Sequence, residues 1–342
     1  MKYVLGIDQG HSQTRAVVCD LTGMMLGVGV APGACHAVHG IEQAMAGVQQ
    51  AARQALAQAE VIPAQVAMVM CGLTGADWPD EFELLQECVE QLGLGQKVRI
   101  KNDALVALRG GTWADYGAVV IAGSGANCAI CSPQGDEFIY GYYHDLELQG
   151  SLGLTLRALS AIRRAATGRE PPTVLAGRIL AVFSCPDVDS LMRRRVEDHL
   201  RLEDARRIAP LVFQAAREGD LVAAKIIRAF GEGLAEMVTA GLQRFHMTQL
   251  AVDVVLSGNL FKDPSPLLGE AMAAAIHAVA PRARLIHARY EPVVGAALLG
   301  LAELGVTMSV HVRQRVESSS QRLGLIRRRR PAPHVAQAHH TE

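Results

Sequence analysis

The sequence predicts an α/β protein made of two similar halves, and three observations support this prediction. Residues 3–30 have the pattern of three short strands joined by tight turns, which is typical of an antiparallel meander. The same pattern returns at residues 118–140, so the architecture is duplicated within the chain. The chain also has 33 glycines and only 4% aromatic residues. Small residues let helices and turns pack closely, which favours an α/β enzyme over an aromatic-rich binding module.

The first half opens with strands at 3–8, 15–19 and 24–30, and Asp20–Gly23 is a turn signal between the last two. Apolar spacing and composition then predict alternating elements. These are a helix at 40–59, a strand at 66–71, a helix at 79–93, a strand at 98–101 and a helix at 102–110 that begins with an Asn/Asp cap.

The second half repeats the meander and then becomes mostly helical. The expected elements are strands at 118–122, 128–131 and 137–140, helices across 153–245, a buried strand at 252–256, a helix at 266–279, a strand at 284–287 and a helix at 292–304. Residues 312–342 contain Arg327–Arg330 and a His-rich end without an apolar period, so we expect a disordered basic tail.

Composition excludes several classes of protein. The 33 basic and 34 acidic residues nearly cancel, so bulk charge does not favour nucleic acid or an anionic membrane as a partner. No apolar run approaches the ~20 residues of a membrane span, and the N-terminal apolar run stops at Asp8, too early for a signal peptide. Seven scattered cysteines do not form a disulfide framework. We therefore expect a cytoplasmic protein with reduced cysteines.

Two turns carry the residues expected of a phosphate site. Asp8 ends the first strand, and the turn after it contains Gly10, Ser12 and Thr14. Backbone N–H groups and hydroxyls in such a turn can cradle phosphate oxygens, with the acid holding Mg²⁺ through water. Taken alone, this segment is more often a plain hairpin turn. The second meander repeats the arrangement with Gly123, Ser124 and Gly125.

Two further segments complete the pattern. Ser257, Gly258 and Asn259 follow a buried strand, where small residues would let an adenosine lie against the backbone. Asp103 stands at a helix start between the two turns, where a hydroxyl nucleophile needs a base. A plain helix cap explains Asp103 equally well when this residue is considered alone.

Five segments in this order resemble the motifs of the BadF/BadG/BcrA/BcrD ATPases, a branch of the actin/Hsp70/sugar-kinase superfamily that includes N-acetylglucosamine and glucosamine kinases. Residues 6–14 and 119–125 resemble its two phosphate motifs, and 102–104 match its Asn-Asp-Ala. Residues 255–259 fit its adenosine motif, and 292–299 fit its final Pro-x-x-Gly-Ala helix. The resemblance covers about residues 1–306.

This resemblance implies two ribonuclease-H-like domains of the actin-like ATPase type, with ATP and Mg²⁺ in the cleft between them. Residues 1–115 and the returning helix 292–306 would form one domain, and 116–291, with a helical insertion, the other. The implied site residues are Asp103 as catalytic base, Asp8 for Mg²⁺, Gly10, Ser12, Thr14, Gly123, Ser124 and Gly125 for phosphates, and Ser257, Gly258 and Asn259 for adenosine. A homodimer is implied too.

The hinge and the sugar loops follow from the same resemblance. The helices at 103–110 and 293–304 would cross, and Ala104, Ala107, Gly295 and Gly300 would allow their close approach. The sugar would be bound by His36, Asn102, Asp103, His144 and Asp145.

The chain departs from the family pattern at several positions. Gln9 and His11 replace glycines of the first phosphate motif, where they could crowd a phosphate or, for His11, contact it. The sugar-binding Asn of the family falls at Cys35 or His36, and its sugar-holding Asp falls at Leu148, with Asp145 or Glu147 as replacements. Loss of that acid would change specificity strongly.

The predicted function is therefore ATP-dependent phosphorylation of a hydroxyl on an amino sugar or a related sugar. One alternative is an ATP- or sugar-binding sensor with weakened catalysis. The other is an ATPase activator of a redox enzyme, since the family includes iron–sulfur activators. Cys128 and Cys131 form a Cys-x-x-Cys pair on a predicted buried strand, but they lack the cluster context of those activators, which favours core cysteines.

Overall fold

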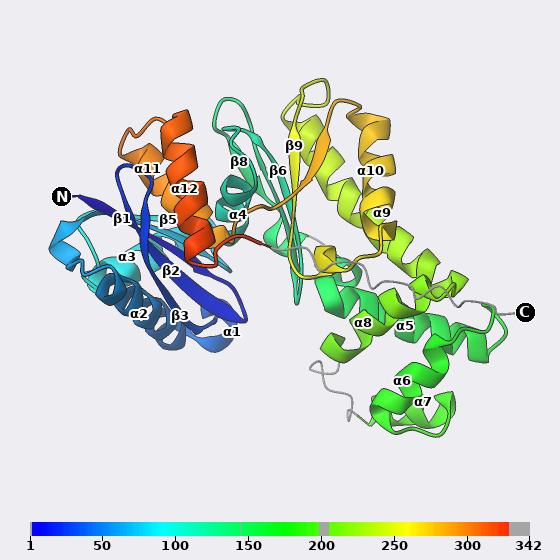
Figure 1. Ribbon diagram of the computed structural model, residues 1–342. Helices are drawn as coiled ribbons and strands as arrows, with labels where there is room; N and C mark the ends of the chain where they lie inside the picture. Colours follow the sequence, from blue (N-terminus) through cyan, green and yellow to red (C-terminus); the bar gives the residue numbers. More distant parts are fainter. Residues whose placement is uncertain (1, 144, 198–204, 328–342) are drawn as a thin grey trace, which may run out of the picture.

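Two five-stranded sheets with the same topology form the protein. The computed structural model describes residues 2–143, 145–197 and 205–327. The strand orders are β3-β2-β1-β4-β5 and β8-β7-β6-β9-β10, so three antiparallel strands precede two parallel ones in each sheet (Figure 1). The strands are β1 Tyr3–Gln9, β2 Gln13–Asp20, β3 Met25–Pro32, β4 Val66–Leu73, β5 Val98–Asn102, β6 Gly117–Ala122, β7 Ala126–Cys131, β8 Glu137–Ile139, β9 Asp253–Ser257 and β10 Arg284–His287. The α/β class and both meanders are confirmed.

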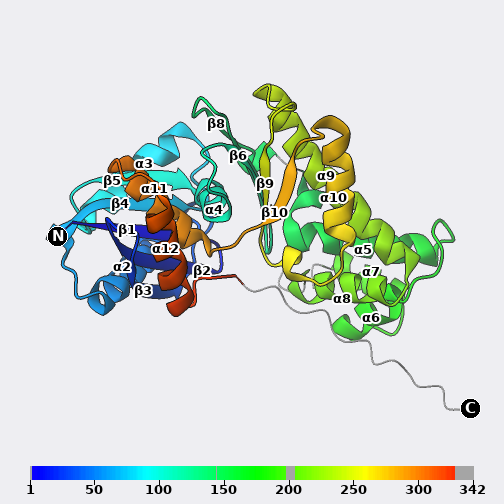
Figure 2. The ribbon, with the colours of Figure 1, turned by 45° about the horizontal axis from the view of Figure 1, so that its top comes forward.

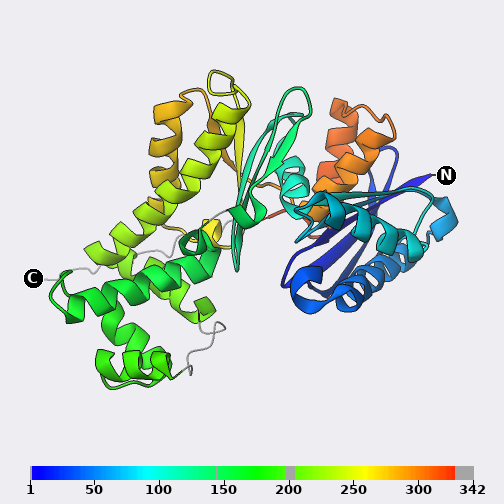
Figure 3. The ribbon, with the colours of Figure 1, turned by 180° about the vertical axis from the view of Figure 1, so that it is seen from behind.

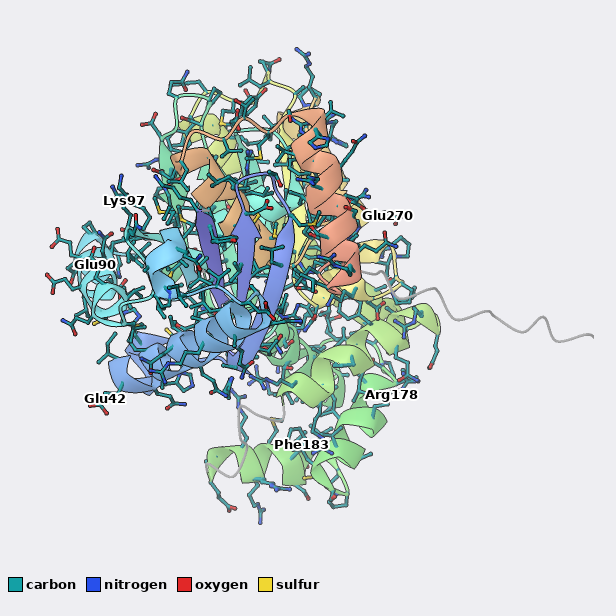
Figure 4. All side chains as sticks on the ribbon, turned by 60° about the vertical axis from the view of Figure 1, so that its left-hand side comes forward. Glu42, Glu90, Lys97, Arg178, Phe183 and Glu270 are labelled. Atoms are coloured by element: carbon teal, nitrogen blue, oxygen red, sulfur yellow. The ribbon has the colours of Figure 1, made fainter. Side chains whose placement is uncertain are left out.

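Most helices also fall where the sequence predicts them, and the two exceptions among the described helices are His36–His39 and Val310–Arg322. The helices are α1 His36–His39, α2 Ile41–Gln58, α3 Pro79–Gln91, α4 Asp103–Gly111, α5 Gly150–Ala166, α6 Leu175–Phe183, α7 Val188–Val196, α8 Ala205–Arg217, α9 Leu221–Arg244, α10 Leu267–Val279, α11 Pro292–Glu303 and α12 Val310–Arg322. Helices α5–α8 form an insertion at the far end of the second half, where α6 carries Arg178 and Phe183 (Figure 4). None of the described helices has the length and apolar character needed to span a membrane.

Each sheet is covered on both faces. In the first half, α2 and α3 cover one face and α11 and α12 the other, as the views from both sides show (Figures 1 and 3). Charged side chains such as Glu42 and Glu90 point outward from α2 and α3 (Figure 4). In the second half, α9 and α10 pack on the outer face. The inner face of that sheet packs against α4, whose Ala107 and Leu108 belong to one core with Val255.

Helices α4 and α11 cross between the two sheets. A Cβ added at Gly295 of α11 would lie 1.9 Å from the carbonyl oxygen of Val106 and 2.5 Å from the backbone nitrogen of Gly110. Only a residue without a side chain allows this approach. The added Cβ at Gly300 would instead meet Val4 and Met70, so this glycine brings α11 close to the first sheet rather than to α4. We propose that each sheet with its helices is one of the two expected domains.

The prediction of a disordered tail from residue 312 is wrong for residues 312–327. Ser309 caps α12, and Val312 and Val316, four residues apart, are buried against the first sheet. The chain then pairs with the linker before α11 through a bridge between Tyr290 and Ile326 (Figure 2). The apolar face of α12 is short and lies among arginines, so the composition of this segment does not reveal it. Residues 328–342 lie outside the described part of the chain.

Candidate active site

A cleft of about 340 Å³ lies between the two halves, within the size range of small-molecule sites. It is lined by residues from the ends of β1, β4, β6 and β9 and from the loops that follow them, because corresponding strand ends of the two sheets meet there. The predicted site residues that line it are Gly10, Ser12, Asp103, Gly123, Ser124, Gly125, Gly258 and Asn259. Residues that sequence reasoning did not assign also line it, among them Thr74, Asp77, Asn127, Gln149 and Arg327.

The first turn presents some of its polar groups to the cleft and buries others. His11 and Ser12 line the cleft, whereas Thr14 is fully buried and donates its hydroxyl to the Pro32 carbonyl at 3.0 Å. Gln9 is buried as well, and its amide donates to the Ala44 carbonyl at 2.7 Å. Gln9 therefore does not crowd a ligand in the cleft. Burial lowers the pKa of His11, and Coulomb interactions with His39 and Arg206 lower it further.

The second turn is built against two other elements. Gly123 donates its N–H to the Gly125 carbonyl at 2.8 Å, and Ser151, in the first turn of α5, donates its N–H to the Gly123 carbonyl at 2.8 Å. The turn therefore lies at a helix N-terminus, where partial positive charge favours anions. Gly258 has φ +102°, and an added Cβ would lie 2.1 Å from the Ala122 carbonyl oxygen. The segment 257–259 thus packs directly on the turn.

Two acids at the cleft, Asp8 and Asp103, have raised proton affinities. Burial, followed by the charge of Asp103, raises the pKa of Asp8 to about 8. Burial, followed by the charge of Asp77, raises the pKa of Asp103 to about 7. Hydrogen bonds from the Thr74 hydroxyl and the Asn127 amide act in the opposite direction and lower this pKa. A divalent cation near Asp8 would relieve the repulsion between Asp8 and Asp103. Mg²⁺ binds through one or two carboxylates together with water and substrate phosphates, and this donor set fits it.

The raised pKa of Asp8 predicts a pH-dependent cost in stability. The native state keeps a proton that the unfolded state releases above a pKa of about 3.9, so stability falls as pH rises toward 8. Asp8→Asn removes this cost. In thermal melts with EDTA, we expect the variant to gain a few degrees in Tm over the wild type at pH 8, and less at pH 5. The exposed carboxylate variant Glu83→Gln is the control. An Asp8→Asn gain that does not grow with pH would contradict the prediction.

A side-chain network connects the two halves beside Asp103. Asn102 is fully buried and caps α4 by accepting the Ala104 N–H at 2.9 Å. Its amide donates to Asp77 Oδ1 at 2.8 Å, and Asn127 from the second half donates to Asn102 Oδ1 at 3.2 Å. Asn127 Oδ1 in turn accepts the Gly141 N–H at 3.1 Å. Asn102 therefore holds other groups in place and does not itself line the cleft.

Asp77 is the acid that sequence reasoning missed. It follows β4 and lines the cleft, and burial, followed by the charge of Glu81, raises its pKa to about 6. An added Cβ at Gly141 would lie 2.8 Å from its carboxyl carbon, so the loop of the second half packs directly on it. The only local signal was an acid after a buried strand.

The other expected sugar residues lie elsewhere. His36 Nε2 lies 3.5 Å from Glu81 Oε1, and His36 does not line the cleft. The neighbouring Cys35 does line it. Asp145 is exposed and, with Glu147, lines a separate hollow. Leu148, which stands where the family has its sugar-holding Asp, is buried against Gly233 of α9 and does not line the cleft. His144 lies outside the described residues.

The remaining predicted groups have structural surroundings. Ser257 is buried, with its hydroxyl accepting a hydrogen bond from Arg327 at 2.7 Å. Cys128 and Cys131 both lie on β7 without a disulfide partner, and burial raises the pKa of each thiol. Within the described ranges, no three His, Cys, Asp or Glu side chains gather to hold a metal ion on their own.

Comparison with known proteins gives a consistent set of relatives. Residues 5–300 match the model of the BadF/BadG/BcrA/BcrD ATPase family. The chain is 23% identical over 306 residues to an N-acetylmuramic acid/N-acetylglucosamine kinase of Clostridium acetobutylicum, covering 89% of this chain and 99% of that protein.

Solved structures show the same fold. A candidate N-acetylglucosamine kinase of Chromobacterium violaceum superimposes with a TM-score of 0.65 at 22% identity, over 87% of this chain and 99% of that one. A ROK family glucokinase of Streptomyces griseus, in complex with glucose and AMPPNP, gives a TM-score of 0.56 at 19% identity over the same shares. The two sheets and the cleft between them therefore belong to a fold shared with sugar kinases.

Proposed function

Because the chain belongs to the BadF/BadG/BcrA/BcrD ATPase family, we propose that it transfers the γ-phosphoryl group of ATP to a hydroxyl of an amino sugar or a related sugar. One observation carries this proposal. Asp103, with its pKa raised to about 7, stands in the same cleft as two Gly/Ser turns of matching topology. The curated relative of Clostridium acetobutylicum is a kinase of such sugars and matches over nearly its full length.

Asp103 acts as the general base in this reaction. Its ionised carboxylate accepts the proton of the sugar hydroxyl as that oxygen forms a bond to the γ-phosphorus, and the bond from the γ-phosphorus to ADP breaks. A base with a pKa near the working pH both exists ionised and accepts the proton readily. Asn127 and Thr74 donate to the carboxylate and so fix its direction.

The nucleotide binds along the two turns. Ser12 and Ser124 face the phosphates, and the N-terminus of α5 supports the second turn against their negative charge. Gly258 and Asn259 line the adenosine end of the cleft. Asp8 would hold Mg²⁺, which would supply positive charge against the phosphates. Burial of Thr14 and Ser257 makes both residues supports of the site rather than ligand contacts.

We propose that Asp77 binds a sugar hydroxyl. Asp77 replaces the acid that is absent at Leu148, and the bond from Asn102 holds its carboxylate at the cleft. Closure of the two halves would bring the sugar hydroxyl to Asp103, since Asn127 and Gly141 belong to the second half and Asp77 to the first.

Asp77→Asn tests this assignment. A charged hydrogen-bond acceptor is removed while its shape is kept, so we expect KM for the sugar to rise about 10- to 100-fold, with KM for ATP unchanged. Glu147→Gln is the matched control, because Glu147 is an exposed acid that pairs with Arg157 outside the cleft. Steady-state kinetics in both substrates measure the effect. An unchanged sugar KM in Asp77→Asn would remove Asp77 from the substrate site.

A coupled ADP-release assay with Mg²⁺-ATP tests the function itself. The panel contains glucosamine, N-acetylglucosamine, N-acetylmannosamine, N-acetylmuramic acid and glucose, with Asp103→Asn as the blank. Turnover on one sugar, lost in the blank, supports the kinase. ATP binding without turnover on any of them would contradict the amino-sugar kinase and favour a sensor.

We further propose that the protein acts in the cytoplasm as a homodimer, without nucleic acid as a partner. The balanced charge of 33 basic and 34 acidic residues and the unpaired described cysteines support this setting, and the dimer rests on the family resemblance.

A further inference from the structure

A single arginine from the C-terminal segment reaches the cleft. Arg327 lines it, although it stands 319 positions along the chain from Asp8. Its side chain is only 12% exposed. Its Nη1 donates to Ser257 Oγ at 2.7 Å, and its Nε lies 3.7 Å from Glu291 Oε2. The segment resembling the family motifs ends near residue 306, so no motif points to this residue.

The backbone holds Arg327 at this place. Arg327 donates its N–H to the Arg289 carbonyl at 2.8 Å, and Glu291 donates its N–H to the Leu325 carbonyl at 2.8 Å. Residues 325–327 therefore pair with the linker between β10 and α11, which is where the chain passes from the second half back to the first (Figure 2). Leu325 is buried in the core that α11 and α12 share. This anchoring lowers the entropy lost when the side chain binds a ligand.

The Arg327 guanidinium lies between the segment 257–259 of the second half and Asp8 of the first half. Ser257 precedes Gly258 and Asn259, and a Cβ added at Gly123 would lie 3.6 Å from the Asn259 nitrogen. The Ser257 hydroxyl that Arg327 contacts is thus part of the segment that packs on the second turn. On the other side, the positive charge of Arg327 acts on Asp8 at the end of β1.

A polyphosphate in the cleft needs positive charge near it. Three acids, Asp8, Asp77 and Asp103, stand at or beside the cleft, and each of them repels a polyphosphate when it is ionised. Among the described residues that line the cleft, Arg327 is the one lysine or arginine. The 3.7 Å separation from Glu291 is too long for a hydrogen bond, so a phosphate oxygen offers the guanidinium a stronger partner.

We propose that Arg327 binds a phosphate group of the nucleotide, which makes the C-terminal segment 323–327 part of the ATP site. The inference rests on the proposed ATP-dependent function. It assigns to this segment a role that the family motifs in residues 5–300 do not include. When the nucleotide binds, the guanidinium moves away from Glu291 and forms a bidentate pair with phosphate oxygens.

Calorimetric titration with MgATP, ADP and adenosine tests the proposal, because adenosine lacks the phosphates. For Arg327→Gln we expect MgATP and ADP to bind about 10- to 100-fold more weakly, with adenosine binding unchanged. Arg327→Lys keeps the positive charge but not the planar guanidinium, so MgATP and ADP should bind about three- to tenfold more weakly, again with adenosine unchanged. Arg322→Gln is the matched control: Arg322 also anchors the C-terminal segment, through the Met25 carbonyl, but lies outside the cleft.

The outcomes separate the proposals. Unchanged or tighter MgATP binding in Arg327→Gln would overturn the inference, as would an equal loss for MgATP and adenosine, which indicates a brace rather than a phosphate contact. Wild-type protein that binds no MgATP would instead overturn the proposed function. If Arg327→Gln does not fold, Arg327→Lys carries the test through the same comparison of MgATP with adenosine.

Discussion

Asp103→Asn is expected to lower kcat about a thousandfold while both substrates still bind. Loss of a general base costs roughly 10²- to 10⁴-fold, and the Asn amide cannot accept the hydroxyl proton. The kinetic pattern differs from that of Asp77→Asn, which we expect to change the sugar KM. A coupled assay at saturating ATP and sugar measures kcat, and titration of the variant with MgATP checks that the nucleotide site is intact.

The same residue predicts the pH profile of the wild type. The base must be ionised, so kcat/KM should rise with pH and level off above the Asp103 pKa of about 7. The direction follows from burial, which raises this pKa and leaves the carboxylate protonated in mild acid. A kcat/KM that is flat from pH 5 to 8, or a kcat of Asp103→Asn within tenfold of the wild type, would place the base elsewhere.

Gly295→Ala is expected to cost about 3 kcal/mol of stability, at the upper end of overpacking effects. The added Cβ would lie 1.9 Å from the Val106 carbonyl oxygen and 2.5 Å from the Gly110 nitrogen, and both are backbone atoms of α4 that cannot rotate away. The helices must separate, and α4 carries Asp103 at its first position. We therefore expect kcat to fall along with stability.

Gly269→Ala provides the matched control for this substitution. Gly269 lies in α10, and an added Cβ would meet nothing within 4 Å. Alanine should therefore stabilise the helix by about 0.5–1 kcal/mol. Urea unfolding of both variants measures the difference. A Gly295→Ala variant as stable as Gly269→Ala would show that the two helices are not held at this crossing.

Local patterns predicted most of the fold. Strand and helix positions, the duplicated meander and the two Gly/Ser turns depend on residues close together in the chain, and the structure confirms them. The tail prediction failed at α12 because only a few apolar residues, such as Val312 and Val316, make its contact with the sheet. A stripe of this size gains its free energy from the surface it meets, which composition does not reveal.

The candidate site divides in the same way. The sequence by itself determined which residue types could form the phosphate turns and the base, because turn chemistry and order along the chain are local properties. Only the tertiary structure decided which hydroxyls line the cleft: Ser12 does, whereas Thr14 is buried on the strand that follows. It also brought Asp77, Asn127 and Arg327 beside Asp103 and Asp8 from distant segments. Burial and Coulomb energies depend on distance in space, and these energies set the proton affinities of the site.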